Sequence, residues 1–116
     1  MINLDYQSRT PIYEQIINEI EKYVSLGILK PKEQILSIRE MASTLGINPN
    51  TVKKAYSELE NRGVIQTFST KGTFISENVD VVKNNNISSK IEEIKVIITE
   101  LEKLGITKDE ILDKLK

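Results

Sequence analysis

Apolar residues recur along this chain of 116 residues at the spacings of short amphipathic helices. In the middle of the chain, two such helices follow each other closely. Ser37 and Glu40 have the spacing of a capping box, in which each side chain binds the backbone N–H of the other residue, and Gly46 can end that helix without a Cβ clash. Asn48 and Pro49 are suited to the cap and the first turn of the next helix. This order of signals predicts a helix-turn-helix.

The second of these helices divides into an apolar and a polar face. At about 100° per residue, its apolar face comprises Val52, Ala55, Tyr56 and Leu59. Its polar face comprises Asn50, Lys54, Ser57 and Asn61, flanked by Thr51 and Lys53. Amide, hydroxyl and ammonium groups bind base edges and phosphates, but any solvated helix face is also polar. No acidic residue lies between Met41 and Ser57, whereas solvated faces usually mix charges of both signs, so the pattern favours nucleic-acid binding.

The segment before the helix-turn-helix predicts an arm and a first helix. Residues 1–9 have the character of a poorly fixed arm, extended near its start. Thr10 and Pro11 are suited to cap and begin a helix, which Gly27 ends. Its apolar stripe consists of Ile12, Ile16, Ile17, Ile20, Tyr23 and Val24. Such a stripe indicates a helix that supports the core.

Three short segments have strand composition. Residues 33–36 precede the helix-turn-helix, and residues 64–68 and 73–76 follow it, separated by a turn at residues 69–72. Three helices followed by a hairpin predict a winged helix-turn-helix, so the expected fold class is mainly α with a small β-hairpin wing. At the tip of the hairpin we expect a contact with a minor groove or with phosphates through Lys71. The alternative is that Lys71 is an ordinary exposed residue of a turn.

The last third of the chain predicts a linker and a helical hairpin. Residues 78–89 include three successive asparagines, and after a short extension of the preceding strand they are expected to form a polar linker. Ser89 is suited to cap a helix that Gly105 ends, and Thr107 and Glu110 form another capping box. The expected organisation is an arm at residues 1–9, a winged helix-turn-helix at 10–77, a linker at 78–89 and a helical tail at 90–116.

The tail carries more aliphatic surface than a helical hairpin of this size can bury by itself. Its apolar positions are Ile91, Ile94, Ile97, Ile98, Leu101, Leu104, Ile111, Leu112 and Leu115. On the first helix they make a seam broader than a two-stranded coiled coil demands. Either the tail packs on the winged helix of its own chain or it packs on a second copy. The second arrangement would give a symmetric homodimer.

Composition limits the chemistry that the chain can perform. It has no His and no Cys, the usual catalytic bases, nucleophiles and soft metal ligands, so we expect no enzyme, no metal site and no cofactor. The net charge of −1 is low for a nucleic-acid binder, but residues 1–76 carry nine Lys or Arg against eight Asp or Glu. No signal peptide and no apolar run of membrane-spanning length is evident, which predicts a cytoplasmic protein without a membrane partner.

Several motifs together resemble the GntR-type regulators. They are Pro11-Ile-Tyr-x-Gln-Ile, Gly27-Ile-Leu-Lys-Pro, Leu36-Ser-Ile-Arg-Glu-Met-Ala-x-x-Leu-Gly-Ile, Asn50-Thr-Val-Lys-Lys-Ala-Tyr-x-x-Leu-Glu, Gly63-Val-Ile and Lys71-Gly-Thr-Phe-Ile. The resemblance covers about residues 10–76. It implies a bacterial transcription factor with an N-terminal winged helix-turn-helix and a C-terminal part for dimerisation or effector binding. The chain departs from the usual residues of that family at Lys32, Leu36, Pro49 and Thr70.

The resemblance implies double-stranded operator DNA as the partner. Asn50 could bind an adenine edge, while Arg39 and the lysines would supply salt-sensitive phosphate contacts. Together with the polar face described above, the expected DNA-binding residues are Ser37, Arg39, Asn48, Asn50, Thr51, Lys53, Lys54, Ser57, Thr70, Lys71 and Gly72.

The short tail is similar to that of the YtrA-type subgroup of these regulators. This resemblance implies a dimeric repressor of its own operon, which would encode an ABC-type transporter or an envelope response. It leaves open whether a small-molecule effector exists. The alternative is an architectural or protein-binding winged helix without operator specificity.

Overall fold

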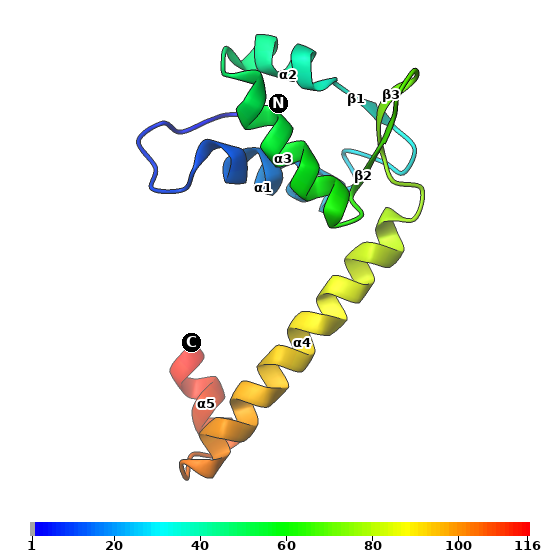
Figure 1. Ribbon diagram of the computed structural model, residues 1–116. Coiled ribbons are helices and arrows are strands. Elements are labelled where there is room, and N and C mark those ends of the chain that lie inside the picture. The colour runs from blue at the N-terminus through cyan, green and yellow to red at the C-terminus, as the bar shows by residue number, and fades with distance from the viewer. Residues whose placement is uncertain (1) are drawn as a thin grey trace. The chain divides into compact units, whose positions relative to one another are not determined.

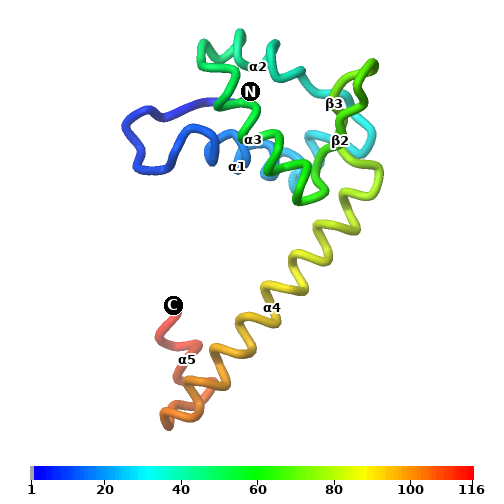
Figure 2. Tube along the Cα trace, viewed as in Figure 1, coloured from blue at the N-terminus to red at the C-terminus, as the bar shows by residue number. Residues whose placement is uncertain are grey.

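The computed structural model describes residues 2–116, drawn as a ribbon in Figure 1 and as a Cα trace in Figure 2. Its elements are α1 (Ile12–Ser25), β1 (Gln34–Ile35), α2 (Ile38–Leu45), α3 (Pro49–Asn61), β2 (Ile65–Phe68), β3 (Gly72–Ile75), α4 (Val79–Lys103) and α5 (Lys108–Leu115). They belong to two compact units, of which the first ends at Val82 and the second comprises Lys83–Lys116. The first unit is a winged helix-turn-helix, as the order of sequence signals predicts.

The helix-turn-helix begins and ends at the predicted residues. The Oγ of Ser37 accepts a 3.1 Å hydrogen bond from the backbone N–H of Glu40, whose carboxylate accepts a 3.0 Å bond from the backbone N–H of Ser37. Gly46 ends α2 with a φ of 66°, a left-handed conformation that favours glycine. The side chain of Asn48 accepts a 2.8 Å bond from the backbone N–H of Asn50. These caps confirm the predicted boundaries between α2 and α3.

Helix α1 begins one residue later than the cap-and-proline pattern predicts. Pro11 is itself the N-cap, with φ −55° and ψ 150°, and Ile12 is the first helical residue. The prediction that Thr10 caps this helix is therefore wrong, because Pro11 keeps an extended ψ and takes the N-cap position itself. At the other end, Gly27 follows the helix with a φ of 74°, as expected.

The three strands form one antiparallel sheet in the order β1-β3-β2 (Figure 1). In the hairpin, Gln66 pairs with Phe74 and Phe68 pairs with Gly72, which confirms the predicted wing. Strand β1 pairs with the other edge of β3, as the composition of residues 33–36 predicts. The sheet therefore joins the segment before α2 to the wing.

The core of the first unit is built from the predicted apolar stripes of α1 and α3 together with the inner face of the sheet. Its buried members are Ile2, Ile16, Ile17, Ile20, Val24, Met41, Ala42, Val52, Ala55, Tyr56, Leu59, Val64, Ile65, Ile75 and Val79. Helix α3 packs on both α1 and α2, so its polar face is left on the outside.

The N-terminal arm is fixed over residues 2–9, contrary to the prediction for residues 1–9, of which the first lies outside the described residues. Ile2 is only 8% exposed and belongs to the core. The side chain of Gln15 also binds the arm, accepting a 2.8 Å hydrogen bond from the backbone N–H of Asp5 and donating bonds of 2.9 Å to the carbonyls of Asp5 and Thr10. The burial of Ile2 and the three hydrogen bonds of the Gln15 side chain hold the arm in place, although most of its residues are polar.

Residues 78–89 do not form the predicted irregular linker. They lie almost wholly within α4, and Ser89 is an interior helical residue instead of a cap. Relative to alanine, each asparagine or serine in a helix lowers its stability by only about 0.5 kcal/mol. The buried side chain of Val79 holds the start of this helix in the core. A helix that is already nucleated extends through such residues at little cost.

The second unit contains the rest of α4 and the short helix α5, which folds back beside the end of α4 (Figure 2). The capping box of Thr107 and Glu110 forms as predicted. Of the nine apolar tail positions, Ile111 is buried at 7% exposure, whereas Ile94 is 50% and Leu104 is 82% exposed.

Within residues 2–116, every helix falls short of the length and apolar content needed to cross a membrane.

Candidate nucleic-acid interface

The outer face of α3 presents the polar side chains that the sequence places there. Asn50, Lys53 and Ser57 are exposed and Thr51 is half-buried, while the opposite face of the helix is buried in the core. The first turn of α3 contains no acidic residue, so the positive end of the helix dipole is not offset there. This end of α3 is therefore a surface of hydrogen-bonding and cationic groups suited to an anionic partner.

Lys54 is directed toward α1, although the sequence pattern places it with the polar face. Its ammonium nitrogen lies 4.0 Å from the centroid of the Tyr13 ring, within the range of a cation–π interaction. The Tyr13 hydroxyl donates a 3.3 Å hydrogen bond to Glu14, and the charge of that carboxylate raises the pKa of Tyr13. Lys53 and Lys54 are thus neighbours in sequence with different surroundings.

Ser37 and Arg39 lie at the start of α2. Ser37 is half-buried and its hydroxyl is engaged in the capping box, whereas Arg39 is exposed. The backbone N–H and then the hydroxyl of Ser37 lower the pKa of the Glu40 carboxyl, so Glu40 is charged and held at the helix N-terminus. Arg39 is the cationic side chain that α2 can offer to a phosphate.

Tyr56 connects the two helices of the motif from inside. Its hydroxyl donates a 2.6 Å hydrogen bond to the backbone carbonyl of Leu36, the residue before the cap of α2. Burial, and next the charge of Glu40, raises the pKa of Tyr56. The phenol therefore stays protonated and fixes the start of α2 relative to α3.

The turn of the wing is held from β1. The backbone N–H of Lys71 donates a 3.0 Å bond to the carbonyl of Phe68, and the Lys71 carbonyl accepts a 3.2 Å bond from the side-chain amide of Gln34. Gly72 has a φ of 116°, and a Cβ there would lie 2.6 Å from the Gln34 amide nitrogen. The positive φ favours glycine at this position, whereas the Gln34 amide is the end of a flexible side chain and could move away from a Cβ. Thr70 and the Lys71 side chain are exposed.

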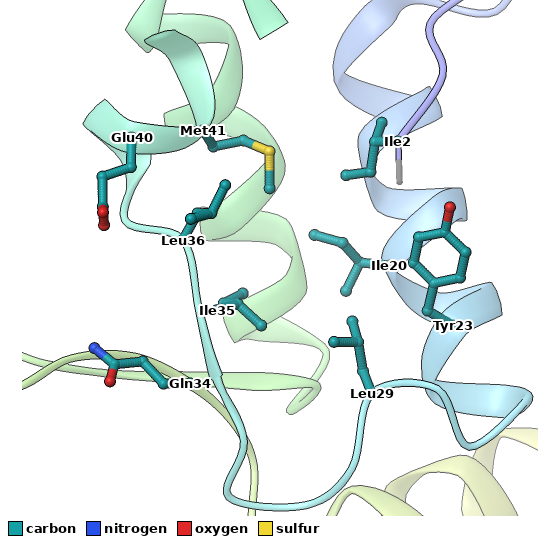
Figure 3. A pocket seen from close by; sticks show the side chains of 9 residues that line it. All are labelled: Ile2, Ile20, Tyr23, Leu29, Gln34, Ile35, Leu36, Glu40 and Met41. Atoms are coloured by element: carbon teal, nitrogen blue, oxygen red, sulfur yellow. The ribbon is translucent and has the colours of Figure 1, made fainter. Parts of the chain in front are cut away.

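An apolar cavity of about 510 Å³ lies between α1 and the segment that leads into α2 (Figure 3). The side chains that Figure 3 shows turned toward it are those of Ile2, Ile20, Leu29, Ile35, Leu36 and Met41. The polar residues at its edge act elsewhere, since Glu40 caps α2 and Gln34 binds the wing. The cavity is thus an aliphatic gap behind the elements that carry the exposed cations.

The sequence pattern does not single out three residues that lie beside the expected contact residues, namely Tyr13, Gln34 and Phe68. Tyr13 follows an apolar position of α1 and gives no signal of its own. The hairpin offers one only when its turn is placed at residues 69–71, one residue shorter than the predicted turn at 69–72, because β3 begins at Gly72 and Phe68 pairs with Gly72. That register places Phe68 and Phe74 on the same face of the sheet, opposite to the buried side chains.

Comparison with known proteins finds one family. Residues 12–75 match the bacterial regulatory proteins of the gntR family. All of the chain aligns at 39% identity with 90% of the HTH-type transcriptional repressor YtrA of Bacillus subtilis (strain 168). The structure of YtrA from Sulfolobus acidocaldarius, a GntR-family transcription factor, matches 98% of this chain and 92% of its own, with 37% identity and a TM-score of 0.62. The AraR DNA-binding domain in complex with operator ORR3 matches 64% of this chain and 89% of its own, with 26% identity and a TM-score of 0.56.

Proposed function

The chain belongs to the gntR family of bacterial regulatory proteins, and from this premise we propose that it is a dimeric repressor that binds a two-fold symmetric operator in its own operon. It is a transcriptional regulator of GntR type with a DNA-binding domain, and it is not an enzyme. The name of the Bacillus subtilis relative, a transcriptional repressor, supports repression as the outcome. The genes of the operon would belong to an ABC-type transporter or an envelope response.

The observation that carries the proposal is the exposed, acid-free N-terminal half of α3. In a helix-turn-helix, this end of the second helix enters the major groove. An asparagine side chain can form two hydrogen bonds with an adenine edge, and Asn50 is exposed at that end. Lys53 beside it, Arg39 at the start of α2 and Lys71 in the wing supply cations for phosphates.

Two copies are required for specific binding at physiological salt. One chain offers only a few exposed cations around α3 and the wing, so its electrostatic affinity for DNA is small. The aliphatic side chains left exposed on the second unit, such as Ile94 and Leu104, support a second copy as the partner that covers them. A symmetric pair would then bind half-sites about 34 Å apart along the duplex.

Selection of bound duplexes from a random pool tests this proposal directly. The expected product is one sequence with two-fold symmetry, and footprinting on it should protect two half-sites. Replacing Asn50 with Ala should weaken binding of this sequence by about 1–3 kcal/mol and relax the preference at one base position. Asn61→Ala is the matched control, because Asn61 is an exposed asparagine at the other end of the same helix, about 16 Å away.

The same experiment separates the alternative function. An architectural protein would protect DNA without a preferred sequence, and a protein-binding winged helix would protect none. Equal binding of the selected sequence by the Asn50→Ala and Asn61→Ala variants would contradict the assignment of the reading face. In cells, loss of the chain should raise transcription of its neighbouring genes.

A further inference from the structure

One face of the wing sheet takes no part in either the core or the surface of α3. Successive side chains of a strand point to opposite faces of the sheet. Ile65, Thr73 and Ile75 point inward and are buried. The other face carries two phenylalanines, of which Phe68 is 48% exposed.

These phenylalanines support each other at the tip of the wing. Phe68 pairs with Gly72 directly beside the turn, and its ring meets the ring of Phe74 edge to face, with centroids 5.8 Å apart. Such an arrangement is favourable for aromatic rings. Phe74 is half-buried, so it acts as a fixed support, and the outer ring of Phe68 is presented to solvent in a defined place.

A groove of about 310 Å³ accompanies this pair. It is lined by Lys32, Gln66, Phe68, Lys71, Phe74, Ile75 and Glu77. Lys71 comes from the turn of the wing and Lys32 from the segment before β1, so cations from two parts of the chain border one aromatic surface. Figure 1 shows that the turn between β2 and β3 lies on the same side of the first unit as α2.

The charge of the groove favours an anionic occupant. Lys32 pairs with Glu77 at 3.3 Å, but both side chains are largely exposed, and exposed ion pairs contribute little. Lys32 can therefore exchange this carboxylate for another anion. The groove combines an exposed aromatic ring with two cationic side chains, and these suit the apolar sugars and the charged phosphates of a nucleic-acid backbone.

We propose that this groove contacts the sugar–phosphate backbone of the operator, with the Phe68 ring on a deoxyribose and with Lys71 and Lys32 on the phosphates beside it. The inference rests on the proposed function and adds an apolar contact to it. A sugar contact of this kind reads no base. It fixes the position of the wing, and thereby the register of α3 in the neighbouring groove.

Hydroxyl-radical footprinting tests the contact, because this reagent reports the accessibility of each deoxyribose. The Phe68→Ser variant should lose protection of a few sugars outside the positions covered by α3, and its affinity for the selected duplex should fall about tenfold. Phe68→Leu keeps an apolar side chain and should retain most of the affinity. Thr67→Ala, a change on the other face of the same strand, should leave both the footprint and the affinity as they are.

Salt dependence distinguishes a sugar contact from an indirect effect on the lysines. Lys71→Ala and Lys32→Ala should each reduce the slope of log affinity against log salt by about 1. Phe68→Ser should leave that slope unchanged, and Glu77→Gln should raise the affinity because a negative charge leaves the groove. If Phe68→Ser lowers both the affinity and the slope of log affinity against log salt, the ring only positions Lys71. That result would contradict the proposed contact with a sugar.

The results also separate this inference from the proposed function. A wild-type chain that selects no duplex contradicts both. A second outcome would contradict only the inference. In that outcome the wild type selects a duplex and the Asn50→Ala variant no longer binds it, but the folded Phe68→Ser variant binds it normally with an unchanged footprint. The groove would then serve another anion, such as an acidic peptide. Thermal unfolding shows whether each variant is folded.

Discussion

The hydroxyl of Tyr56 donates a 2.6 Å hydrogen bond to the carbonyl of Leu36. This bond joins a buried residue of α3 to the backbone immediately before the cap of α2, although the two are twenty positions apart. The helix-turn-helix is thus fixed at both ends of α2, by the turn at Gly46 and by this contact. Arg39 and Asn50, which belong to different helices, depend on it for their relative position.

Replacing Tyr56 with Phe should destabilise the protein by about 1–3 kcal/mol, because the Leu36 carbonyl loses its partner in a part-buried place. The ring keeps its packing, so the fold should persist. Urea unfolding measures the loss. DNA affinity measured well below the unfolding midpoint should also fall, since the start of α2 becomes free to shift. An unchanged midpoint would show that water replaces the phenol without cost.

The same residue should make the protein sensitive to alkali. Burial raises the pKa of Tyr56 in the folded state, so the neutral phenol is favoured there, whereas an unfolded tyrosine has a pKa of about 10. Its contribution to stability is complete below pH 10 and is lost as the pH rises further. Between pH 9 and pH 11, the free energy of unfolding of wild type should fall by about 1.4 kcal/mol more than that of Tyr56→Phe. Tyr13 and Tyr23, whose pKa values are also raised, are present in both proteins and cancel in this comparison.

Two substitutions at Ser37 separate its structural role from a DNA contact. The hydroxyl caps α2 through the backbone N–H of Glu40, so Ser37→Ala should cost about 1 kcal/mol of stability, while Ser37→Gly should cost only a few tenths. Both variants lack the hydroxyl. If Ser37 also binds a phosphate, the two should lose the same affinity for DNA despite their different stabilities. If the residue acts only as a cap, the glycine variant should bind DNA like the wild type.

Local signals predict the helix-turn-helix well because each one acts within a few residues. A cap, a left-handed glycine and a proline determine where α2 and α3 begin and end whatever surrounds them. The wing is predictable for the same reason, since a short turn fixes its register. Six of the expected DNA-facing positions lie in α3 or at its N-cap, and the sequence period places their side chains once the helix is known.

Features that depend on distant contacts are not predictable in this way. The arm has a polar sequence, yet Ile2 reaches the core and Gln15 binds Asp5. The asparagines at residues 84–86 suggest a linker, yet they continue a helix that is anchored at Val79. The direction of Lys54 follows from a ring on another helix. In each case a contact with a distant part of the chain determines a structure that the local sequence does not indicate.

Lys53 and Lys54 should differ in their effects on DNA binding. Lys53 is exposed on the outer face of α3, so Lys53→Ala should weaken binding to every duplex and reduce the salt slope by about 1. Lys54 lies over Tyr13, so Lys54→Ala should cost about 0.5–1 kcal/mol of stability and change the salt slope less. Titrations at several salt concentrations, together with thermal unfolding, measure both effects. Equal salt slopes for the two variants would show that Lys54 leaves the Tyr13 ring when DNA binds.

The tail should control the number of copies in solution. Ile94 is half-exposed on the predicted seam of α4, whereas Thr99 is exposed and lies about 140° away around the same helix. Ile94→Glu places a charge where an apolar interface would exclude water, and should convert a dimer into monomers. Thr99→Glu adds the same charge outside the seam and should leave the dimer intact. Sedimentation equilibrium measures the mass of each variant, and footprinting then shows whether the monomer loses the paired half-sites. A wild-type chain that sediments as a monomer at micromolar concentration would contradict the dimer. An Ile94→Glu variant with the mass of the wild-type dimer would contradict the placement of its interface at the seam of α4.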